Sequence, residues 1–334
     1  MPFKMTDLIQ SELDDEQINA NFSLDILKGL SEFPKRIPSK YFYDDQGSEY
    51  FKKIMESQDY YLTNLEQEIL DQYSPELPLF FSEKKLNIVD LGAGDGSKSM
   101  TLIKAFQKKD ICTDYYPIDI SKGALLSLQK NLDAISDETQ VNGIIADYFT
   151  GIKWLANQNK NRNLVLFLGS NLGNFSEKES RDFLHHLWEA LNQGDYLYLG
   201  FDLKKKISIL NKAYNDKEGY TRAFNLNLLK RINRELGANF DVDQFNHYGS
   251  YDPDRGAMVS YLISQKNQDV YIESVQKNFS FKSFEPIHVE FSYKYLPEEI
   301  ESIAEGTGYS VQKFFYDSKK WFGNVLLKVE KDSK

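Results

Sequence analysis

The feature that most constrains the fold is an alternation of two patterns between residues 86 and 202. Short, nearly continuous apolar runs, typical of buried strands, alternate there with longer amphipathic segments, typical of helices. We predict strands at 86 to 91, 115 to 119, 142 to 146, 163 to 168 and 195 to 202, and helices at about 97 to 107, 121 to 134, 148 to 157 and 176 to 193. Such an alternation builds βαβ units, so we expect an α/β fold with a parallel sheet covered on both faces.

The segments on either side extend this sheet and add a second part to the molecule. A predicted helix at 297 to 306 and predicted strands at 309 to 316 and 321 to 330 are expected to close the sheet with a hairpin. Helical spacing also predicts helices in 14 to 32 and 48 to 72, on either side of an aromatic loop at 33 to 48. Residues 203 to 294 form a long insertion, with predicted helix at 207 to 237 and predicted strands at 256 to 264, 268 to 275 and 286 to 295.

Charge and cysteine content exclude several classes of function. The 334 residues include 50 acidic and 40 basic side chains, and the net charge of −10 would repel a polyphosphate, so we expect no nucleic-acid partner. The single cysteine cannot form an internal disulfide, and no Cys/His spacing matches a zinc site. No apolar stretch approaches the ~20 residues of a membrane span, and the N-terminus lacks the apolar core of a signal peptide. We therefore expect a cytoplasmic protein without a membrane partner. Separately, we expect it to be a monomer.

A glycine-rich loop directly follows the first predicted strand of the alternation and opens a helix. It reads Val89-Asp-Leu-Gly-Ala-Gly-Asp-Gly-Ser-Lys98, with glycines at 92, 94 and 96. Glycine lets the backbone pass close to a ligand, and the following helix presents free N–H groups. Asp119 ends the next strand, where it can accept both hydroxyls of a ribose, and Asp147 ends the third strand, where it or its neighbour can meet an adenine amino group. The pattern predicts a site for an adenosine-containing cofactor.

Two cofactors fit such a site, a nicotinamide dinucleotide and S-adenosylmethionine. The spacing Gly-x-Gly-x-Gly differs from the dinucleotide pattern Gly-x-Gly-x-x-Gly, and a closing hairpin is typical of class I methyltransferases. S-adenosylmethionine has no pyrophosphate, so an acidic residue such as Asp90 is tolerable near the loop and can face the cationic methionine end. These features favour a methyltransferase over a dehydrogenase.

Five blocks of sequence then resemble one family, the L-histidine Nα-methyltransferases of ergothioneine biosynthesis, which form the trimethylated betaine hercynine. The resemblance covers nearly the whole chain. The blocks are residues 38 to 48 with 60 to 66; the loop from Asp90 to Ser99; Phe167-Leu-Gly-Ser-Asn-Leu-Gly-Asn-Phe175; the motifs at 213 to 216, 224 to 225, 233 to 236 and 240 to 243; and Glu290-Phe-Ser-Tyr-Lys-Tyr295. The resemblance implies a class I S-adenosylmethionine-dependent methyltransferase, with a Rossmann-like domain at 67 to 203 and 295 to 334. It also implies an α+β substrate-binding domain at 1 to 66 and 204 to 294.

The family's motif positions imply roles for individual residues. Tyr60, Asn174 and Tyr214 would hold the α-carboxylate of the amino acid, Gly169 would supply backbone near the amine, and Tyr43 would sit near the amino group. We name no strong general base: Tyr43 or a chain of water molecules could relay the proton of the amine, and the relay is our own hypothesis. Glu290 and Ser292 would read the imidazole edge, because residues two apart on a strand face the same side. The cofactor-binding residues would be Asp90, Gly92, Gly94, Lys98, Asp119 and Asp147. The substrates would be L-histidine and its mono- and dimethyl forms, and methyl transfer from a sulfonium requires no metal.

One position departs from the family pattern. Where a methionine commonly flanks the side-chain pocket, this chain has Ser260. A more polar or larger pocket would allow another aromatic amino acid or a small amine as the acceptor. A second alternative is a non-catalytic nucleotide-binding partner protein, which would need broken acid positions, whereas Asp90, Asp119 and Asp147 are all present.

Overall fold

The chain folds into two compact units. The computed structural model describes residues 3–8, 15–120, 122–132, 139–156, 158 and 160–331. Unit 1 comprises Met1–Glu12, Leu62–Lys204 and Tyr295–Lys334, and unit 2 comprises Leu13–Tyr61 and Lys205–Lys294. The boundaries of these units differ from those of the predicted domains: residues 1–12, residues 62–66 and Lys204 belong to unit 1 and not to the part that contains the insertion.

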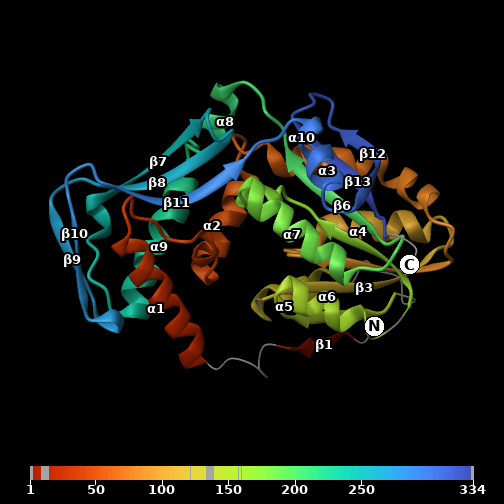
Figure 1. Ribbon diagram of the computed structural model, residues 1–334, viewed down its shortest axis with the longest axis horizontal. Coiled ribbons are helices and arrows are strands. Elements are labelled where there is room, and N and C mark those ends of the chain that lie inside the picture. The colour runs from red at the N-terminus through yellow and green to blue at the C-terminus, as the bar shows by residue number, and fades with distance from the viewer. Residues whose placement is uncertain are drawn as a thin grey trace. The chain divides into compact units, whose positions relative to one another are not determined.

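Unit 1 is built around one eight-stranded sheet (Figure 1). Its strands, in spatial order, are β1 (Phe3–Asp7), β4 (Val141–Ile145), β3 (Cys112–Asp119), β2 (Lys85–Leu91), β5 (Arg162–Phe167), β6 (Tyr196–Asp202), β13 (Phe322–Val329) and β12 (Tyr309–Tyr316). Neighbouring strands are parallel, except that β13 runs antiparallel to both β6 and β12. The central strands β2, β5 and β6 are buried along almost their whole length, which requires cover on both faces of the sheet.

Helices from the second and third chain segments of unit 1 provide that cover. They are α3 (Leu62–Tyr73), α4 (Ser97–Gln107), α5 (Lys122–Asn131), α6 (Tyr148–Ala156), α7 (Glu177–Ala190) and α10 (Pro297–Glu305), with short 3₁₀ helices η2 (Ser74–Phe80) and η4 (Asn171–Asn174). The predicted parallel sheet, its strands and helices, and the closing hairpin are confirmed to within a few residues. Ser121, residues 133–134 and residue 157 of the predicted helices lie outside the described residues.

One strand of this sheet is absent from the prediction. The five residues of β1 pair in parallel with β4, from Phe3 opposite Val141 to Asp7 opposite Ile145. A five-residue segment at a chain end carries too little periodicity to be distinguished from a loop. Its pairing places the N-terminus in unit 1.

Unit 2 combines the N-terminal helices with the insertion. Its elements are α1 (Asp15–Ser31), η1 (Ser39–Phe42), α2 (Asp45–Glu56), α8 (Ile207–Ala213), α9 (Tyr220–Leu236), η5 (Val242–Gln244), β7 (Phe245–Asp252), β8 (Ala257–Ser264), β9 (Gln268–Ile272), η6 (Glu273–Val275), β10 (Lys277–Phe281) and β11 (Pro286–Tyr293). The strands form a three-stranded antiparallel sheet, β11-β8-β7, and a two-stranded one, β9-β10. One buried cluster joins Phe22 of α1, Phe42 of η1 and Phe224 of α9 to Phe245 and Phe281 of the strands, so the two chain segments share one core.

Several predicted elements of unit 2 differ in detail. The predicted helix at 48 to 72 is two helices, α2 and α3, and the predicted helix at 207 to 237 is α8 and α9. Asp44 starts α2 earlier than predicted, because its side chain accepts a hydrogen bond of 2.7 Å from the N–H of Gly47. Strands β7 and β10 are absent from the prediction, since β7 (FNHYGSYD) contains a glycine and few aliphatic residues.

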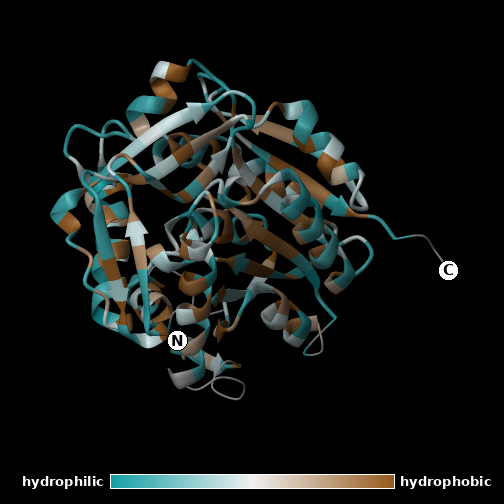
Figure 2. Cartoon of the chain, turned by 60° about the vertical axis from the view of Figure 1, so that its left-hand side comes forward, coloured by the Kyte–Doolittle hydropathy of each residue, from teal (hydrophilic) through white to brown (hydrophobic). Residues whose placement is uncertain are grey.

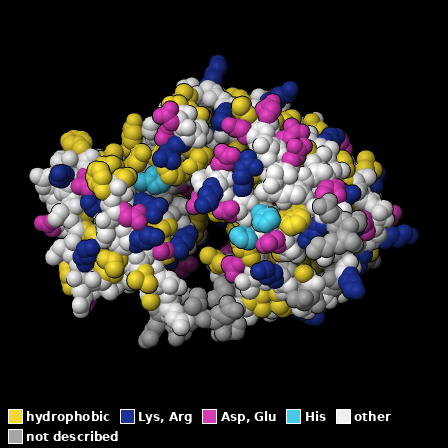
Figure 3. All heavy atoms as spheres, in the orientation of Figure 1, with side chains coloured by type: hydrophobic (Ala, Val, Ile, Leu, Met, Phe, Trp, Pro, Cys, Tyr) yellow, Lys and Arg dark blue, Asp and Glu magenta, His cyan; other side chains and the backbone are white. Residues whose placement is uncertain are grey.

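The surface of both units is mixed in character. The helices in Figure 2 alternate between polar and apolar stretches along their length, as expected for amphipathic helices. Basic and acidic side chains are interspersed over the face shown in Figure 3. Within the described ranges, every helix is too short or too polar to cross a bilayer.

Candidate active site

The strand order of unit 1 locates a ligand site at one edge of the sheet. Strands β2 and β5 are neighbours, and from them the chain proceeds outward in opposite directions, through β3 and β4 on one side and through β6 on the other. In open parallel sheets, ligands bind where the order reverses, beyond the carboxyl ends of the strands. The glycine loop follows β2 at this point and the turn at Gly169 follows β5, so both predicted loops lie at the same position in the sheet.

The three loop glycines have different neighbours. All adopt positive φ values, +75° at Gly92, +57° at Gly94 and +76° at Gly96. A Cβ at Gly92 would lie 3.0 Å from Tyr148 Oη and one at Gly96 would lie 2.2 Å from Leu128 Cδ1, whereas one at Gly94 would have no described atom within 4 Å. The first and third glycines are therefore needed for packing within the protein. Gly94 borders open space, where a cofactor can approach the backbone beside the N-terminus of α4.

Asp90 braces this loop from inside the protein. Its buried carboxylate accepts hydrogen bonds from Tyr115 Oη at 2.8 Å and from Ser99 Oγ in the first turns of α4. Burial raises the pKa of Asp90 to about 6, against the lowering effect of these two hydrogen bonds. Because its contacts are to protein groups, a direct contact with the methionine end of a cofactor stays a prediction.

Asp119 and Asp147 end β3 and β4 at the same edge. Asp119 pairs with Ile145, and its carbonyl accepts the N–H of Ala146 at 3.1 Å, so the two strand ends lie side by side. The Asp147 carboxylate caps α6, accepting from the N–H groups of Phe149 at 3.0 Å and Thr150 at 3.1 Å. Cofactor contact by either acid stays a prediction, and for Asp147 it would have to be shared with the cap.

A residue that the sequence reasoning missed, Glu66 of α3, ties the two loops together. Its fully buried carboxylate forms an ion pair with Lys98 and accepts the N–H of Gly169 at 2.9 Å. A Cβ at Gly200 would lie 2.1 Å from Glu66 Oε1, so a glycine in β6 makes room for the carboxylate. Glu66 stands at the end of one of the family blocks, but only the tertiary contacts distinguish it from a surface acid.

The chain turns sharply after β5. Gly169 has a φ of +78° and Ser170 a φ of +59°, an unusual conformation for a residue with a side chain. The turn brings Asn171 between the loops, since a Cβ at Gly92 would lie 3.6 Å from its Nδ2 and one at Gly169 would lie 3.8 Å from its Oδ1. Asn174, the predicted carboxylate ligand, ends η4 with an exposed side chain. Asn171 is thus a further site candidate that the sequence did not single out.

In unit 2, a row of aromatic side chains leads to the predicted substrate residues. The ring of Tyr43, which is 46% exposed, meets Phe51 and Phe224 edge-on at 5.5 Å between centroids. Phe51 in turn contacts Tyr60 at 6.4 Å, and Tyr60 packs against the cluster that contains Tyr214. The structure therefore connects Tyr43 to Tyr60 by aromatic contacts, and Tyr60 to the cluster of Tyr214 by apolar packing.

The three-stranded sheet presents the remaining predicted residues in two rows. Gly249, Ser260 and Glu290 are opposite one another on β7, β8 and β11. Tyr251, Met258 and Ser292 form the next row on the same face. Met258 lies two residues before Ser260 and packs in one cluster with Tyr214. A methionine therefore does flank the predicted substrate residues, in the row next to that of Ser260.

A β-bulge decides which side chains share this face. The pairing shifts between His288, opposite Tyr261, and Glu290, opposite Ser260. Since Tyr261 and Ser260 are consecutive, they point to opposite faces, and the extra residue places His288 on the face away from Glu290. The His288 ring is 5.8 Å from that of Tyr261, consistent with this side. Alternation alone would have placed His288 beside Glu290.

The predicted polar residues of this face form one cluster with a buried lysine. Tyr214 Oη donates to Ser292 Oγ at 2.6 Å, and Lys294 Nζ donates to both oxygens at 2.8 Å. Burial raises the pKa of Glu290 to about 7, while Lys294 opposes the shift. The Tyr214 hydroxyl is thus hydrogen-bonded to Ser292 and to Lys294, and its predicted contact with a carboxylate stays a prediction.

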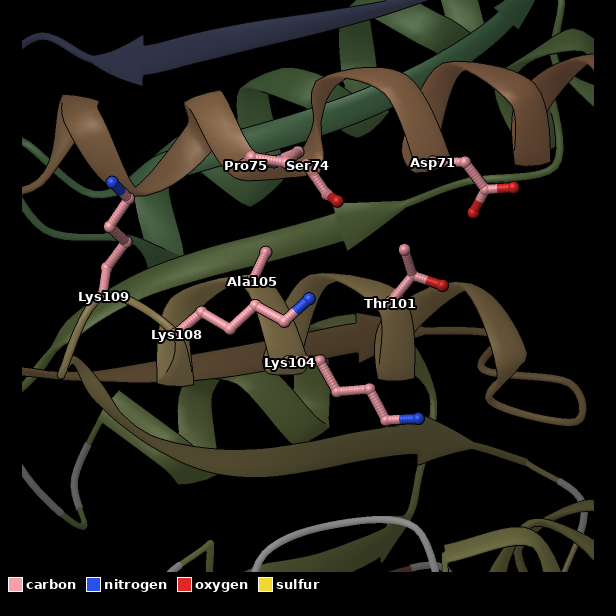
Figure 4. Close-up of a pocket in the computed structure, with 8 residues that line it drawn as sticks. All are labelled: Asp71, Ser74, Pro75, Thr101, Lys104, Ala105, Lys108 and Lys109. Atoms are coloured by element: carbon pink, nitrogen blue, oxygen red, sulfur yellow. The ribbon is translucent and has the colours of Figure 1, made fainter.

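A separate groove of about 510 Å³ lies on unit 1, away from the glycine loop. Figure 4 shows it between α3 with η2 on one side and α4 on the other. Lys104, Lys108 and Lys109 line its α4 side, near the end of α4 that is remote from Gly96. None of the predicted site residues lines this groove.

Comparison with known proteins agrees with the class of site described above. A family model described as histidine-specific, SAM-dependent methyltransferase matches residues 22–329. The chain is 32% identical over 302 residues to histidine N-alpha-methyltransferase of Mycolicibacterium smegmatis, covering 90% of this chain and 93% of that protein. It is 29% identical over 281 residues to ergothioneine biosynthesis protein 1 of Schizosaccharomyces pombe, covering 81% of this chain and 36% of that protein. It is also 26% identical over 333 residues to L-tryptophan methyltransferase trpM of Psilocybe serbica, covering 91% and 92%. With a parallel sheet, a closing hairpin and a glycine loop at the strand reversal, this chain belongs to the family of histidine-specific, S-adenosylmethionine-dependent methyltransferases.

Proposed function

We propose that this enzyme transfers three methyl groups in succession to the α-amino nitrogen of L-histidine, forming its trimethyl betaine. S-adenosylmethionine supplies each methyl group as an electrophile on a sulfonium that is already an activated leaving group. In each transfer the amine lone pair forms the new N–C bond as the C–S bond breaks, and S-adenosylhomocysteine leaves. One proton must leave the amine before each transfer, so the protein has to position the amine, accept protons and exclude water.

The cofactor fits the carboxyl edge of the unit 1 sheet. Gly94 borders open space beside the first turn of α4, and Asp119 ends the neighbouring strand, where a carboxylate can accept ribose hydroxyls. The local charge is also suitable, because Asp90 and Asp119 lie close enough to contribute to the raised pKa of Tyr148, after burial as the main cause. Anionic residues suit a cationic ligand.

The observation that carries the choice of histidine is the position of Glu290 beside Ser292 on one face of β11. A half-buried carboxylate whose pKa is raised to about 7 is costly to keep ionised, and its ionised form becomes more favourable when a ligand donates a hydrogen bond to it. The N–H of an imidazole is such a donor, and Ser292 can serve the second ring nitrogen. Tyr60, Gly169 and Asn174 are our proposed residues for the α-carboxylate and the amine. Tyr214 gives its one hydroxyl proton to Ser292, so we assign it to the cluster beside the imidazole site.

Tyr43 is our proposed proton relay near the amine. Its ring is anchored by Phe51 and Phe224 but remains 46% exposed, so the hydroxyl can reach a ligand or a water molecule. The aromatic face also suits the quaternary ammonium product through cation–π attraction. Tyr43→Phe should slow the methylation steps by about 10²-fold or more, the usual contribution of general acid–base catalysis. Unchanged rates for every step would refute this role.

The function is tested by mass spectrometry of reactions supplied with S-adenosylmethionine and one amino acid. Histidine, tryptophan, tyrosine and phenylalanine are compared at equal concentration, and additions of one, two and three methyl groups are followed. Three additions to histidine alone support the proposal. Methylation of another amino acid with histidine unmodified would overturn the substrate and leave the cofactor chemistry intact.

A second acceptor is favoured by one specific observation. Ser260 is buried directly opposite Glu290, and the similar trpM protein is named for L-tryptophan. An indole has one N–H and no second ring nitrogen, so it could use Glu290 but would leave Ser292 without an acceptor on the ring. The same amino-acid panel decides between the two substrates.

A further inference from the structure

A buried lysine stands behind the residues proposed to read the imidazole. Lys294 follows β11 directly and is 2% exposed. Its backbone N–H is bound to the carbonyl of Gly256 at 2.9 Å, and its ammonium lies 4.8 Å from the centre of the Tyr214 ring. Both contacts hold the side chain in the cluster with Tyr214 and Ser292.

The hydrogen bonds of this cluster use up the acceptor capacity of Ser292. A serine hydroxyl has two lone pairs and one proton. Ser292 Oγ accepts from Lys294 Nζ at 2.8 Å and from Tyr214 Oη at 2.6 Å, which occupies both lone pairs. Its own proton is therefore directed outward, so Ser292 can only donate to a ligand.

Lys294 keeps Ser292 in the role of a donor, because an ammonium group can donate hydrogen bonds but has no atom that accepts them. It also donates to Tyr214 Oη at 2.8 Å, so the phenol proton is directed away from the lysine and toward Ser292. Without the ammonium, Ser292 would regain a free lone pair and could accept as well as donate. Glu290 lies two residues before Ser292 on the same face of β11, and its carboxylate is a hydrogen-bond acceptor when ionised.

We propose that Lys294 is a specificity-determining positioning residue, which fixes Ser292 as a donor so that, with Glu290 as the acceptor, the site selects a neutral imidazole in one orientation. This inference rests on the proposed function. A neutral imidazole carries one N–H and one bare nitrogen, which matches one acceptor and one donor. A ring without nitrogen matches neither, and an imidazolium presents two donors and so meets Ser292 with the wrong polarity.

The test compares Lys294→Met, Ser292→Ala and the double variant. Binding of L-histidine and of 3-(2-thienyl)-L-alanine, whose five-membered ring lacks nitrogen, is measured by titration calorimetry with S-adenosylhomocysteine present. We expect each single variant to weaken histidine binding about tenfold, typical of losing one hydrogen bond. The double variant should be no weaker than Ser292→Ala, because Lys294 acts through Ser292. Binding of the thienyl analogue should change by less than about twofold.

Several results would overturn the inference. Additive losses, about 100-fold in the double variant, or an equal loss for the thienyl analogue would indicate a general structural role for Lys294. Unchanged histidine binding in Lys294→Met would show that the lysine is irrelevant to recognition. If Lys294→Met does not fold, Lys294→Gln serves instead, because an amide can accept as well as donate and so no longer fixes Ser292.

The steady-state constants provide a second readout. Loss of ring recognition should raise KM for histidine with little change in kcat, since the methyl group is transferred to the amine and not to the ring. If the unsubstituted chain neither binds nor methylates histidine, the proposed function itself fails. If it does both while the variants behave additively, only the role of Lys294 fails.

Discussion

A buried glutamate in unit 1, Glu66, and a buried lysine in unit 2, Lys294, are used differently at the two proposed sites. In unit 1, Glu66 is paired with Lys98 and also accepts the N–H of Gly169, so a carboxylate links two loops. In unit 2, Lys294 donates hydrogen bonds to the hydroxyls of Tyr214 and Ser292. The first charge fixes the shape of the backbone, and the second fixes the direction of side-chain protons. Two charges that are buried to a similar extent can therefore differ in how much their removal lowers the free energy of unfolding.

The largest expected effect follows from removing each charge with an apolar residue of similar size. Glu66→Leu leaves the ammonium of Lys98 and the N–H of Gly169 without their acceptor and should cost about 3–5 kcal/mol of the free energy of unfolding. Lys294→Met leaves the hydrogen bond from Tyr214 to Ser292 in place, and its cost should be below about 1.5 kcal/mol. Denaturant unfolding of both variants measures the difference. Equal losses would remove the distinction between the two charges.

Substitutions of two glycines in the unit 1 loop distinguish packing within the protein from contact with the cofactor. Gly96→Ala forces a Cβ to within 2.2 Å of Leu128 Cδ1 in a left-handed conformation and should cost about 2–4 kcal/mol. Gly94→Ala adds only the backbone strain of about 1–2 kcal/mol, because its Cβ enters open space.

The two glycine variants should also differ in their response to cofactor. Gly94→Ala should lose most of the thermal stabilisation that S-adenosylhomocysteine gives to the unsubstituted chain, although the variant itself remains folded. A normal ligand-induced shift in Gly94→Ala would mean that the cofactor does not approach this part of the loop.

The smallest expected effect on stability concerns Glu290 and depends on pH. Its pKa in the folded chain, about 7, lies above that of an exposed glutamate, so the folded state binds this proton more tightly. The resulting stabilisation is complete below about pH 4 and is lost as the pH rises through about 7. Glu290→Gln should therefore raise the free energy of unfolding by about 1–2 kcal/mol at pH 8, a value reduced for the partial exposure of the side chain.

The same substitution should change little in stability at pH 5 and should weaken histidine binding at both pH values. Unfolding at the two pH values, with Glu301→Gln as a matched substitution of an exposed glutamate, measures the pH-dependent part. Destabilisation by Glu290→Gln at pH 8 would show that the ionised carboxylate is well paired within the protein, and would contradict a residue held ready for a ligand.

Much of unit 1 could be predicted because its signals are local. The apolar runs of β2, β5 and β6 read as buried strands, since a strand covered on both faces is apolar throughout. The glycine loop could be placed because it joins a predicted strand to a predicted helix. The edge strand β1 could not, because nothing within Phe3–Asp7 reveals its pairing with residues more than 130 positions away.

Local sequence patterns are sufficient to predict the strand and helix order of unit 1, the family, and the residue types available for binding a cofactor and an amino acid. Tertiary structure alone decided that Glu66 is buried beneath two loops, that a bulge after His288 turns Glu290 toward Ser260, and that Lys294 reaches Tyr214 and Ser292. The physical reason is that strand periodicity and helix spacing are properties of consecutive residues. Burial of a charge, strand register and the direction of a hydroxyl proton depend instead on partners that folding brings from distant parts of the chain.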